Sequence, residues 1–282
     1  MTNIMIAANY AHPEVLVDTR WLADHLSDKT LRVLEVDMSP DSYQGAHIPG
    51  AVFVNIKTAL MTEKLQLNLE AFAYAQLMSQ LGITRETTVV AYGSYPGTGG
   101  FIIWLFKLFG HPDVRVLNGG YQAWIAEGRP TATALSTYAP TSYQASPIAA
   151  ALRVGSEEVM AALEQVETVV LDVRSLPEYS GELFLMAPPE GSERAGHIPG
   201  SLHLEHSLTL NDDGTFKSFE DLQALFHHHG ITPHKEIFPY CAIGARAGYV
   251  WFVLKYLLGY PNVRNYDGSW NAWSRLPNTL VE

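Results

Sequence analysis

The only cysteine of the 282-residue chain, Cys241, lies where its neighbours could make it a nucleophile. The apolar residues 237–240 come directly before it and predict a short buried strand. The apolar stretch 247–258 follows, and it predicts a helix that is buried on all sides and ends at Gly259 and Pro261. Cys241 is therefore expected in a short loop between the carboxyl end of a strand and the amino end of a helix.

This loop has the features that activate a thiol. The unpaired amide groups at the start of a helix and the positive end of its dipole favour the thiolate form of a nearby cysteine. Arg246 follows after four residues and adds a full positive charge. Gly244 can adopt the unusual backbone angle that a tight curl requires. A lone cysteine is often only a small buried apolar residue, but the strand, tight loop, arginine and helix together favour a nucleophile.

Two kinds of enzyme use a cysteine and an arginine in such a loop. Cysteine-dependent phosphatases have one residue more between the two, which widens the ring around a phosphate. The shorter ring suits a cysteine that carries one extra sulfur atom. The loop and the chain around it resemble the rhodaneses, a family of sulfurtransferases, and specifically those with two tandem domains. The pattern Cys-x-x-Gly-x-Arg is similar to the thiosulfate-using members, whereas mercaptopyruvate-using members typically carry Cys-Gly-Ser-Gly-Val-Thr.

The resemblance implies a thiosulfate sulfurtransferase that needs no metal or organic cofactor. Cys241 would attack the outer sulfur of a small anionic donor, release sulfite, and pass the sulfur from a persulfide to cyanide, a thiol or a protein acceptor. Backbone amides would stabilise the anionic persulfide. The predicted substrate-binding residues are Ala242, Ile243, Gly244, Ala245, Arg246 and Ala247. Three alternatives remain open: a 3-mercaptopyruvate donor, a phosphatase or arsenate reductase that uses the same two side chains, and a non-catalytic persulfide carrier or binding module.

Three residues outside the loop, Asp172, Arg174 and Arg194, are candidates for supporting roles. Asp172 and Arg174 match an Asp-x-Arg sequence that ends a strand in the family, where the resemblance implies that it orders the fold. Some tandem members have a second arginine four residues later, near the donor anion. This chain has Glu178 there, and its charge would repel thiosulfate. Arg194 is the candidate replacement; it lies in the segment 181–196, which has no counterpart in the first half and is either a pocket rim or an idle surface loop.

An internal repeat predicts two copies of one domain. The sequence His-Ile-Pro-Gly at 47–50 recurs 150 residues later, and Ala123-Trp124 recurs 149 residues later as Ala272-Trp273. Each copy alternates predicted strands and helices, so we expect an α/β fold of two tandem rhodanese-like domains, each a mainly parallel sheet with helices on both faces. The predicted boundaries are 1–130 for the first domain, 131–150 for a linker rich in Ala, Thr, Ser and Pro, and 151–282 for the catalytic domain.

The first copy lacks the reactive residues. Its strand at 88–92 and helix at 100–109 match those around Cys241, but the loop at 93–99 has neither cysteine nor arginine. By the repeat spacing this loop is also one residue shorter. The first copy therefore cannot perform thiolate chemistry, and the resemblance implies a structural half that covers the active site of the second.

Composition and charge narrow the environment and the partners. The net charge is −11, which argues against a nucleic-acid partner, and an anionic donor would need a local positive potential at the site. One cysteine fits a reducing compartment. The amino-terminal stretch lacks the basic region of a secretory signal, and no span is apolar enough to cross a membrane. We therefore expect a cytoplasmic protein without a membrane partner.

Histidines and tryptophans in the motifs are expected to be structural. His47 and His197 occur in both copies of the repeat, one of which has no nucleophile, so a role in the turn is favoured over that of a base. The run 227–229 is expected at the solvated end of a helix, because adjacent histidines cannot all face one metal ion. Trp124, Trp270 and Trp273 are expected in the core.

Overall fold

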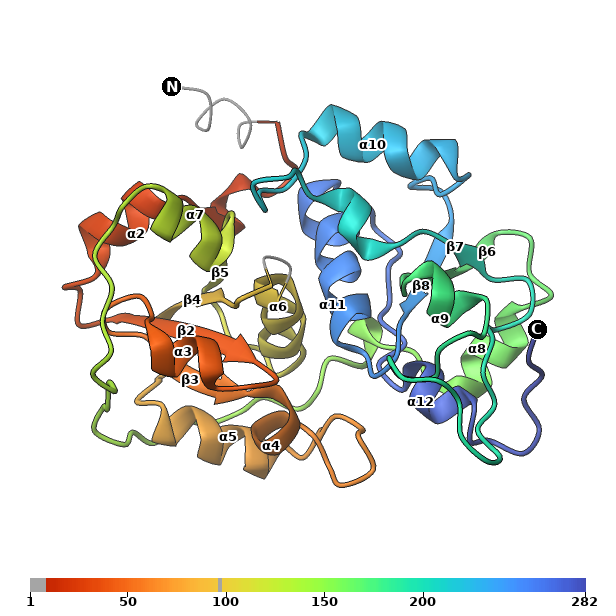
Figure 1. Ribbon diagram of the computed structural model, residues 1–282, viewed down its shortest axis with the longest axis horizontal. Coiled ribbons are helices and arrows are strands. Elements are labelled where there is room, and N and C mark those ends of the chain that lie inside the picture. The colour runs from red at the N-terminus through yellow and green to blue at the C-terminus, as the bar shows by residue number, and fades with distance from the viewer. Residues whose placement is uncertain (1–8, 96–97) are drawn as a thin grey trace.

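The computed structural model describes residues 9–95 and 98–282, so the predictions for the first eight residues and for Pro96 and Gly97 lie outside the described part. Two α/β units lie side by side, with α6 (Thr98–Leu108) and α11 (Ala245–Phe252) packed between them (Figure 1). All strand pairs within both sheets are parallel. The predicted class, two α/β units with parallel sheets, is confirmed.

The first unit is built on a sheet with the strand order β1-β5-β4-β2-β3. Both faces of β2 and β4 are buried because helices cover the sheet on both sides. The strands are β1 (Leu16–Val17), β2 (Leu31–Asp37), β3 (Val52–Asn55), β4 (Thr88–Tyr92) and β5 (Val114–Leu117). The other helices are η1 (Pro13–Val15), α2 (Thr19–His25), α3 (Asp41–Gly45), α4 (Ile56–Leu60), α5 (Ala71–Gln80) and α7 (Gly120–Ala126).

The second unit repeats this arrangement with a shorter sheet, in the order β7-β6-β8. Single parallel bridges join Ile237 to Val263 and Arg153 to Asn265, and they extend the sheet at the β8 edge, as β5 and β1 do in the first unit. The strands are β6 (Thr168–Asp172), β7 (Leu202–His203) and β8 (Glu236–Tyr240). The helices are η2 (Ala150–Leu152), α8 (Ser156–Ala162), α9 (Leu176–Tyr179), η3 (His206–Thr209), α10 (Phe219–His228) and α12 (Ser269–Trp273).

The two units share one apolar core across the crossing of α6 and α11. A single cluster of buried side chains includes residues of both helices and of both sheets. Gly100 and Gly248 allow the close approach: a Cβ on Gly100 would lie 2.9 Å from the ring of Phe252, and one on Gly248 would lie 3.0 Å from the ring of Phe101. Because core rather than water fills this interface, the first unit has a fixed position against the helix that follows Cys241.

Equivalent residues on either side of the loops after β4 and β8 are the same number of positions apart, so the prediction that the first loop is one residue shorter is wrong. Tyr92 and Tyr240 are equivalent, since each hydroxyl accepts a 3.1 Å hydrogen bond from the isoleucine amide of its own His-Ile-Pro-Gly turn. Gly100 and Gly248 are equivalent at the helix crossing. Both pairs are separated by 148 residues. The extra residue of the second copy is absorbed in a π-helical turn, η4 (Val253–Leu257).

This π turn also corrects the predicted uniform helix at 247–258, because α11 begins at Ala245 and changes to π geometry at Val253. The turn presents carbonyl groups to the amino-terminal segment. The amides of Ala11 and His12 donate to Leu257 and Tyr256 at 2.9 and 3.0 Å. The start of the first unit is thereby attached to the second.

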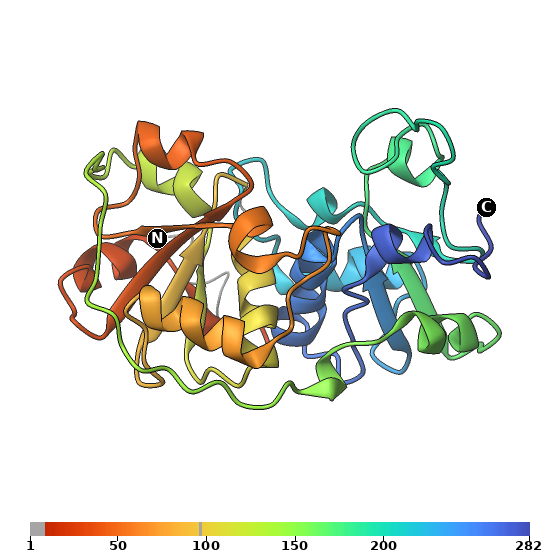
Figure 2. The ribbon, with the colours of Figure 1, turned by 90° about the horizontal axis from the view of Figure 1, so that it is seen from below.

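The segment 131–150 runs along one side of both units with almost no regular structure (Figure 2). It is nevertheless packed, since Tyr138 lies over the Arg32 guanidinium at 3.1 Å and its hydroxyl donates to the Gly50 carbonyl at 2.8 Å. No helix in the described ranges has both the length and the apolarity needed to cross a lipid bilayer.

Candidate active site

The backbone around Cys241 is held in a tight curl between β8 and α11. Gly244 is the residue before α11 and has φ +94° and ψ −16°, a conformation that strongly favours glycine. A side chain here would also collide with the neighbouring segment, since a Cβ would lie 2.5 Å from the Asp267 carbonyl oxygen. Both features require glycine at this position, as the sequence indicated.

The sulfur of Cys241 is buried beneath this curl. The amide of Gly244 donates to Sγ at 3.1 Å, and the Cys241 residue has no exposed surface. Of the predicted amides of Ala242 to Ala247, Gly244 is the one that contacts the sulfur in the described part of the chain. An amide hydrogen bond to an anionic acceptor is stronger than one to a neutral acceptor.

The amino end of α12 turns the loop carbonyls away from the sulfur. Trp270 and Asn271 donate their amides to the carbonyls of Cys241 and Ala242, both at 2.9 Å. In a trans peptide the N–H points opposite to the C=O, so the amides of Ala242 and Ile243 point away from α12. The predicted ring of inward-facing amides requires this orientation.

Ser269 was not predicted, yet it contacts Cys241 directly. Its Oγ accepts from the Cys241 amide at 3.0 Å, donates to the Tyr266 carbonyl at 2.8 Å and lies 3.9 Å from Sγ. Its backbone has φ +51°, and the equivalent Gly120 has φ +55°. A serine at a position where the other copy has glycine carries a backbone cost. The comparison of the two copies could therefore have identified it.

Arg246 and Glu178 form a two-pronged ion pair beside the loop. Arg246 donates from Nη1 and Nη2 to the two carboxylate oxygens of Glu178, each at 2.7 Å. The Glu178 side chain is 2% exposed and that of Arg246 is 22% exposed. Ser175 holds the carboxylate from the other side through its amide at 3.1 Å and its hydroxyl at 2.9 Å. The negative charge of Glu178, which was predicted to repel thiosulfate, is therefore compensated by Arg246 of the loop itself.

The pair shifts both acid–base equilibria. Burial alone would raise the pKa of Glu178, but the hydrogen bonds and charge of Arg246 and the contacts from Ser175 lower the pKa to about 2. Burial alone would lower the pKa of Arg246, but Glu178 and the nearby Cys241 raise it above its ordinary value. Both groups are therefore charged at neutral pH.

Asp172 and Arg174 form a second ion pair, which is fully buried, with a 2.6 Å contact. Arg174 also donates to the Gly196 carbonyl at 2.7 Å, and its guanidinium lies 4.7 Å from the ring centre of Trp270. The pair thus connects β6 to the repeated turn and to α12. Each of these contacts joins elements within the second unit.

Arg194 is not brought to the loop. Its guanidinium donates to the carbonyls of Leu276 (2.9 Å) and Thr279, and to the Thr279 hydroxyl at 3.2 Å. The inserted segment 181–196 is therefore attached to the segment after α12. This geometry does not place Arg194 as the replacement for a donor-binding arginine.

His206 and Tyr95 line the site from opposite units, and neither was predicted. Their ring centres are 5.3 Å apart. His206 Nδ1 donates to the Val173 carbonyl at 3.1 Å. Burial, followed by the charge of Arg246, lowers the pKa of His206 to about 4, so the ring is neutral. Burial also raises the pKa of Tyr95 to about 12, although Arg246 opposes this effect. The first unit therefore contributes a side chain near Arg246.

The motif histidines and tryptophans have structural contacts. His47 and His197 stack on Tyr43 and Tyr179 and hydrogen-bond through Nδ1 to the carbonyls of the same tyrosines, at 2.7 and 3.0 Å. The three tryptophans are buried, and residues 227–229 lie at the end of α10.

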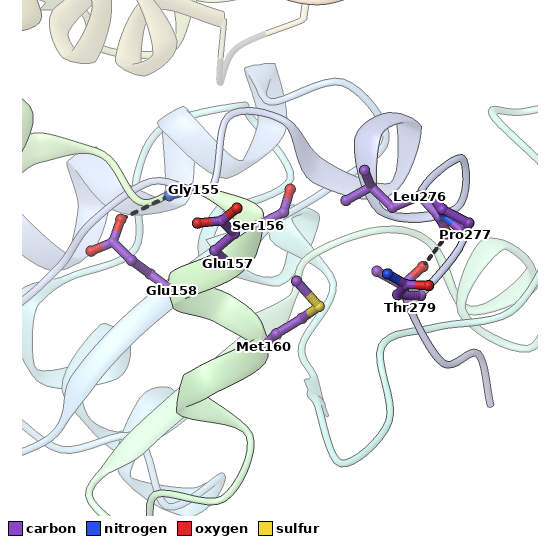
Figure 3. A pocket seen from close by; sticks show the side chains of 9 residues that line it. Gly155, Ser156, Glu157, Glu158, Met160, Leu276, Pro277 and Thr279 are labelled. Atoms are coloured by element: carbon purple, nitrogen blue, oxygen red, sulfur yellow. Dashed lines mark hydrogen bonds between the residues drawn. The ribbon is translucent and has the colours of Figure 1, made fainter.

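Two cavities lie away from this chemistry. One of about 510 Å³ lies between α8 and the segment after α12; its lining includes Met160, Leu276 and Thr279 (Figure 3). The other, of about 580 Å³, is lined in part by Arg194 and Arg275. Neither includes Cys241 or Arg246 among its lining residues.

The structure is that of a tandem α/β protein with two parallel sheets, in which a loop between a strand and a helix of the second unit holds the cysteine. Comparisons with known proteins identify its family. The family model described as the rhodanese-like domain matches twice, at residues 18–127 and 156–276. The chain therefore belongs to the rhodanese-like family, in its tandem form.

Named relatives are similar along nearly their whole length. The chain is 44% identical over 273 residues to the "Sulfur carrier protein TtuD" of Thermus thermophilus, covering 95% of this chain and 96% of the relative. It is 42% identical over 283 residues to the "Putative thiosulfate sulfurtransferase SseA" of Mycobacterium leprae, covering 97% and 93%. A solved structure of an EanB variant, a cysteine persulfide with ergothioneine, has a TM-score of 0.88 at 26% identity and covers 97% of this chain and 71% of that one. These comparisons support a place among sulfurtransferases.

Proposed function

We propose that this protein takes the outer sulfur of thiosulfate onto Cys241 and transfers it to a thiol or cyanide. The Cys241 thiolate attacks the outer sulfur, the S–S bond of the donor breaks, and its electron pair leaves with sulfite. The product on the enzyme is the persulfide anion. A thiolate or cyanide then attacks the terminal sulfur and regenerates the Cys241 thiolate. Sulfur is the group transferred, so no further oxidant or reductant is needed.

The observation that carries this proposal is the sulfur environment. Gly244 donates to Sγ at 3.1 Å, the loop carbonyls are held by α12, and Arg246 carries a positive charge at the end of the ring. Four residues lie between Cys241 and Arg246, a ring suited to one added sulfur. In this proposal the amides stabilise the persulfide, while Ser269 holds the Cys241 amide.

The test is a mass measurement on the intact protein. After incubation with thiosulfate and removal of the donor, we expect Cys241 to gain about 32 Da, and added cyanide should return the original mass with release of thiocyanate. The Cys241→Ser variant should gain nothing. A protein whose mass does not change in thiosulfate would refute the donor. If 3-mercaptopyruvate adds sulfur to Cys241 faster than thiosulfate does, 3-mercaptopyruvate is the preferred donor.

A second candidate is a sulfur carrier that receives its persulfide from another protein. Two observations favour it: Cys241 is fully buried, and the Thermus relative is named a sulfur carrier. A carrier would load slowly from thiosulfate and rapidly from a protein persulfide, and it would show little turnover with cyanide. Comparing these loading rates separates the two functions.

A further inference from the structure

We infer that Glu178 is the positioning residue that fixes Arg246, and that its charge makes the site discriminate against dianionic sulfur donors. The inference rests on the proposed function, since it concerns the donor of the same cysteine. The sequence indicated only that Glu178 would repel thiosulfate; the structure adds its ion pair with Arg246.

The first argument is geometric. A guanidinium has five N–H groups in a rigid plane, and Glu178 occupies Nη1 and Nη2 with two 2.7 Å hydrogen bonds. The carboxylate cannot follow Arg246 if the latter moves, because the Ser175 amide and hydroxyl hold it at 3.1 and 2.9 Å. The three remaining N–H groups of Arg246 therefore each have a fixed direction. A long arginine side chain without this contact would sample many rotamers.

The second argument is the local charge. Arg174 is compensated by Asp172 and Arg246 by Glu178, so these four side chains have no net charge. The chain as a whole has a net charge of −11. A donor with two negative charges thus meets backbone dipoles and a neutralised arginine rather than a free cation. The Glu178 charge weakens the attraction between Arg246 and any anionic donor. This loss of attraction is smaller for a donor with one negative charge than for a donor with two.

The test compares two donors with the same chemistry and different charge. Thiosulfate is a dianion, and an aryl thiosulfonate is a monoanion that delivers its outer sulfur in the same way and leaves as a sulfinate. The quantity measured is the ratio of kcat/KM for thiosulfate to kcat/KM for thiosulfonate. Effects on Cys241 that are common to both donors cancel in this ratio.

Glu178→Gln keeps the size of the side chain and removes its charge. We expect the ratio to rise by about fivefold or more, mainly through a lower KM for thiosulfate. Glu178→Asp keeps the charge and shortens the side chain, so both donors should react more slowly at an unchanged ratio. Glu157→Gln changes the net charge equally at an exposed position on α8 and should leave the ratio unchanged.

A reciprocal variant keeps the inference testable if Glu178→Gln does not fold. Arg246→Gln leaves the Glu178 charge uncompensated, so the ratio should fall. A ratio that stays constant in Glu178→Gln or in Arg246→Gln would overturn the inference, even if overall rates decline. If neither donor adds sulfur to Cys241 in the natural protein, the proposed function fails and the inference with it, whereas loading with a constant ratio refutes the inference alone.

Discussion

Replacing Gly244 with alanine would perturb the sulfur loop in two ways that the structure separates. The residue has φ +94°, a conformation that costs a non-glycine residue about 1–3 kcal/mol. The new Cβ would also lie 2.5 Å from the Asp267 carbonyl oxygen and 3.0 Å from its Cα. These are backbone atoms that cannot swing aside, so overpacking adds about 1–3 kcal/mol. We expect the free energy of unfolding to fall by about 2–6 kcal/mol in total.

Gly230 provides a matched control in the same unit. It has φ +71°, and a Cβ there would have no neighbour within 4 Å. Gly230→Ala therefore has the conformational cost without the collision, and we expect a loss of about 1–2 kcal/mol. Urea unfolding of the two variants measures the difference, which isolates the steric contribution.

The same substitution should slow sulfur loading. Relief of the collision moves the loop, and the Gly244 amide then leaves its 3.1 Å position on Sγ. Loss of one hydrogen bond to a charged group costs about 1.5–3 kcal/mol, so the rate of mass gain from thiosulfate should fall by about tenfold or more. The reasoning is refuted if Gly244→Ala unfolds at the same urea concentration as Gly230→Ala and loads at the natural rate.

Two further predictions concern stability. Asp172→Asn leaves the fully buried Arg174 without its charge partner, so the free energy of unfolding should fall by about 3–5 kcal/mol. Asp37→Asn, at a less buried position, should cost less than about 1 kcal/mol; equal losses would contradict the reasoning. Burial lowers the pKa of both His206 and His111 to about 4. The unfolded chain takes up these protons near pH 6.5, so stability is full above that pH and declines by roughly 3 kcal/mol per histidine towards pH 4. Urea midpoints that stay level between pH 7 and 4 would disprove this.

Much of the fold could be predicted because its signals are local. The strand at 88–92 is β4 as predicted, and Asp18, a residue of a good capping type, accepts from the Trp21 amide at 2.6 Å at the start of α2. The error in loop length came from η4, where a change of hydrogen-bond register inside a helix leaves no mark on an apolar pattern. The spacing between the two copies showed that the second copy has one extra residue, but it did not show where that residue lies.

The sequence by itself determined the candidate nucleophile, the spacing between Cys241 and Arg246 and the two-domain architecture, because these depend on residue type and on spacings along the chain. Only the tertiary structure decided the partners of these residues. Glu178 is 68 positions from Arg246, and Ser269 is 28 positions from Cys241. Asn271 donates to carbonyls of the first unit more than 200 positions away. Such contacts depend on how two packed units bring distant segments together, and no local propensity encodes that placement.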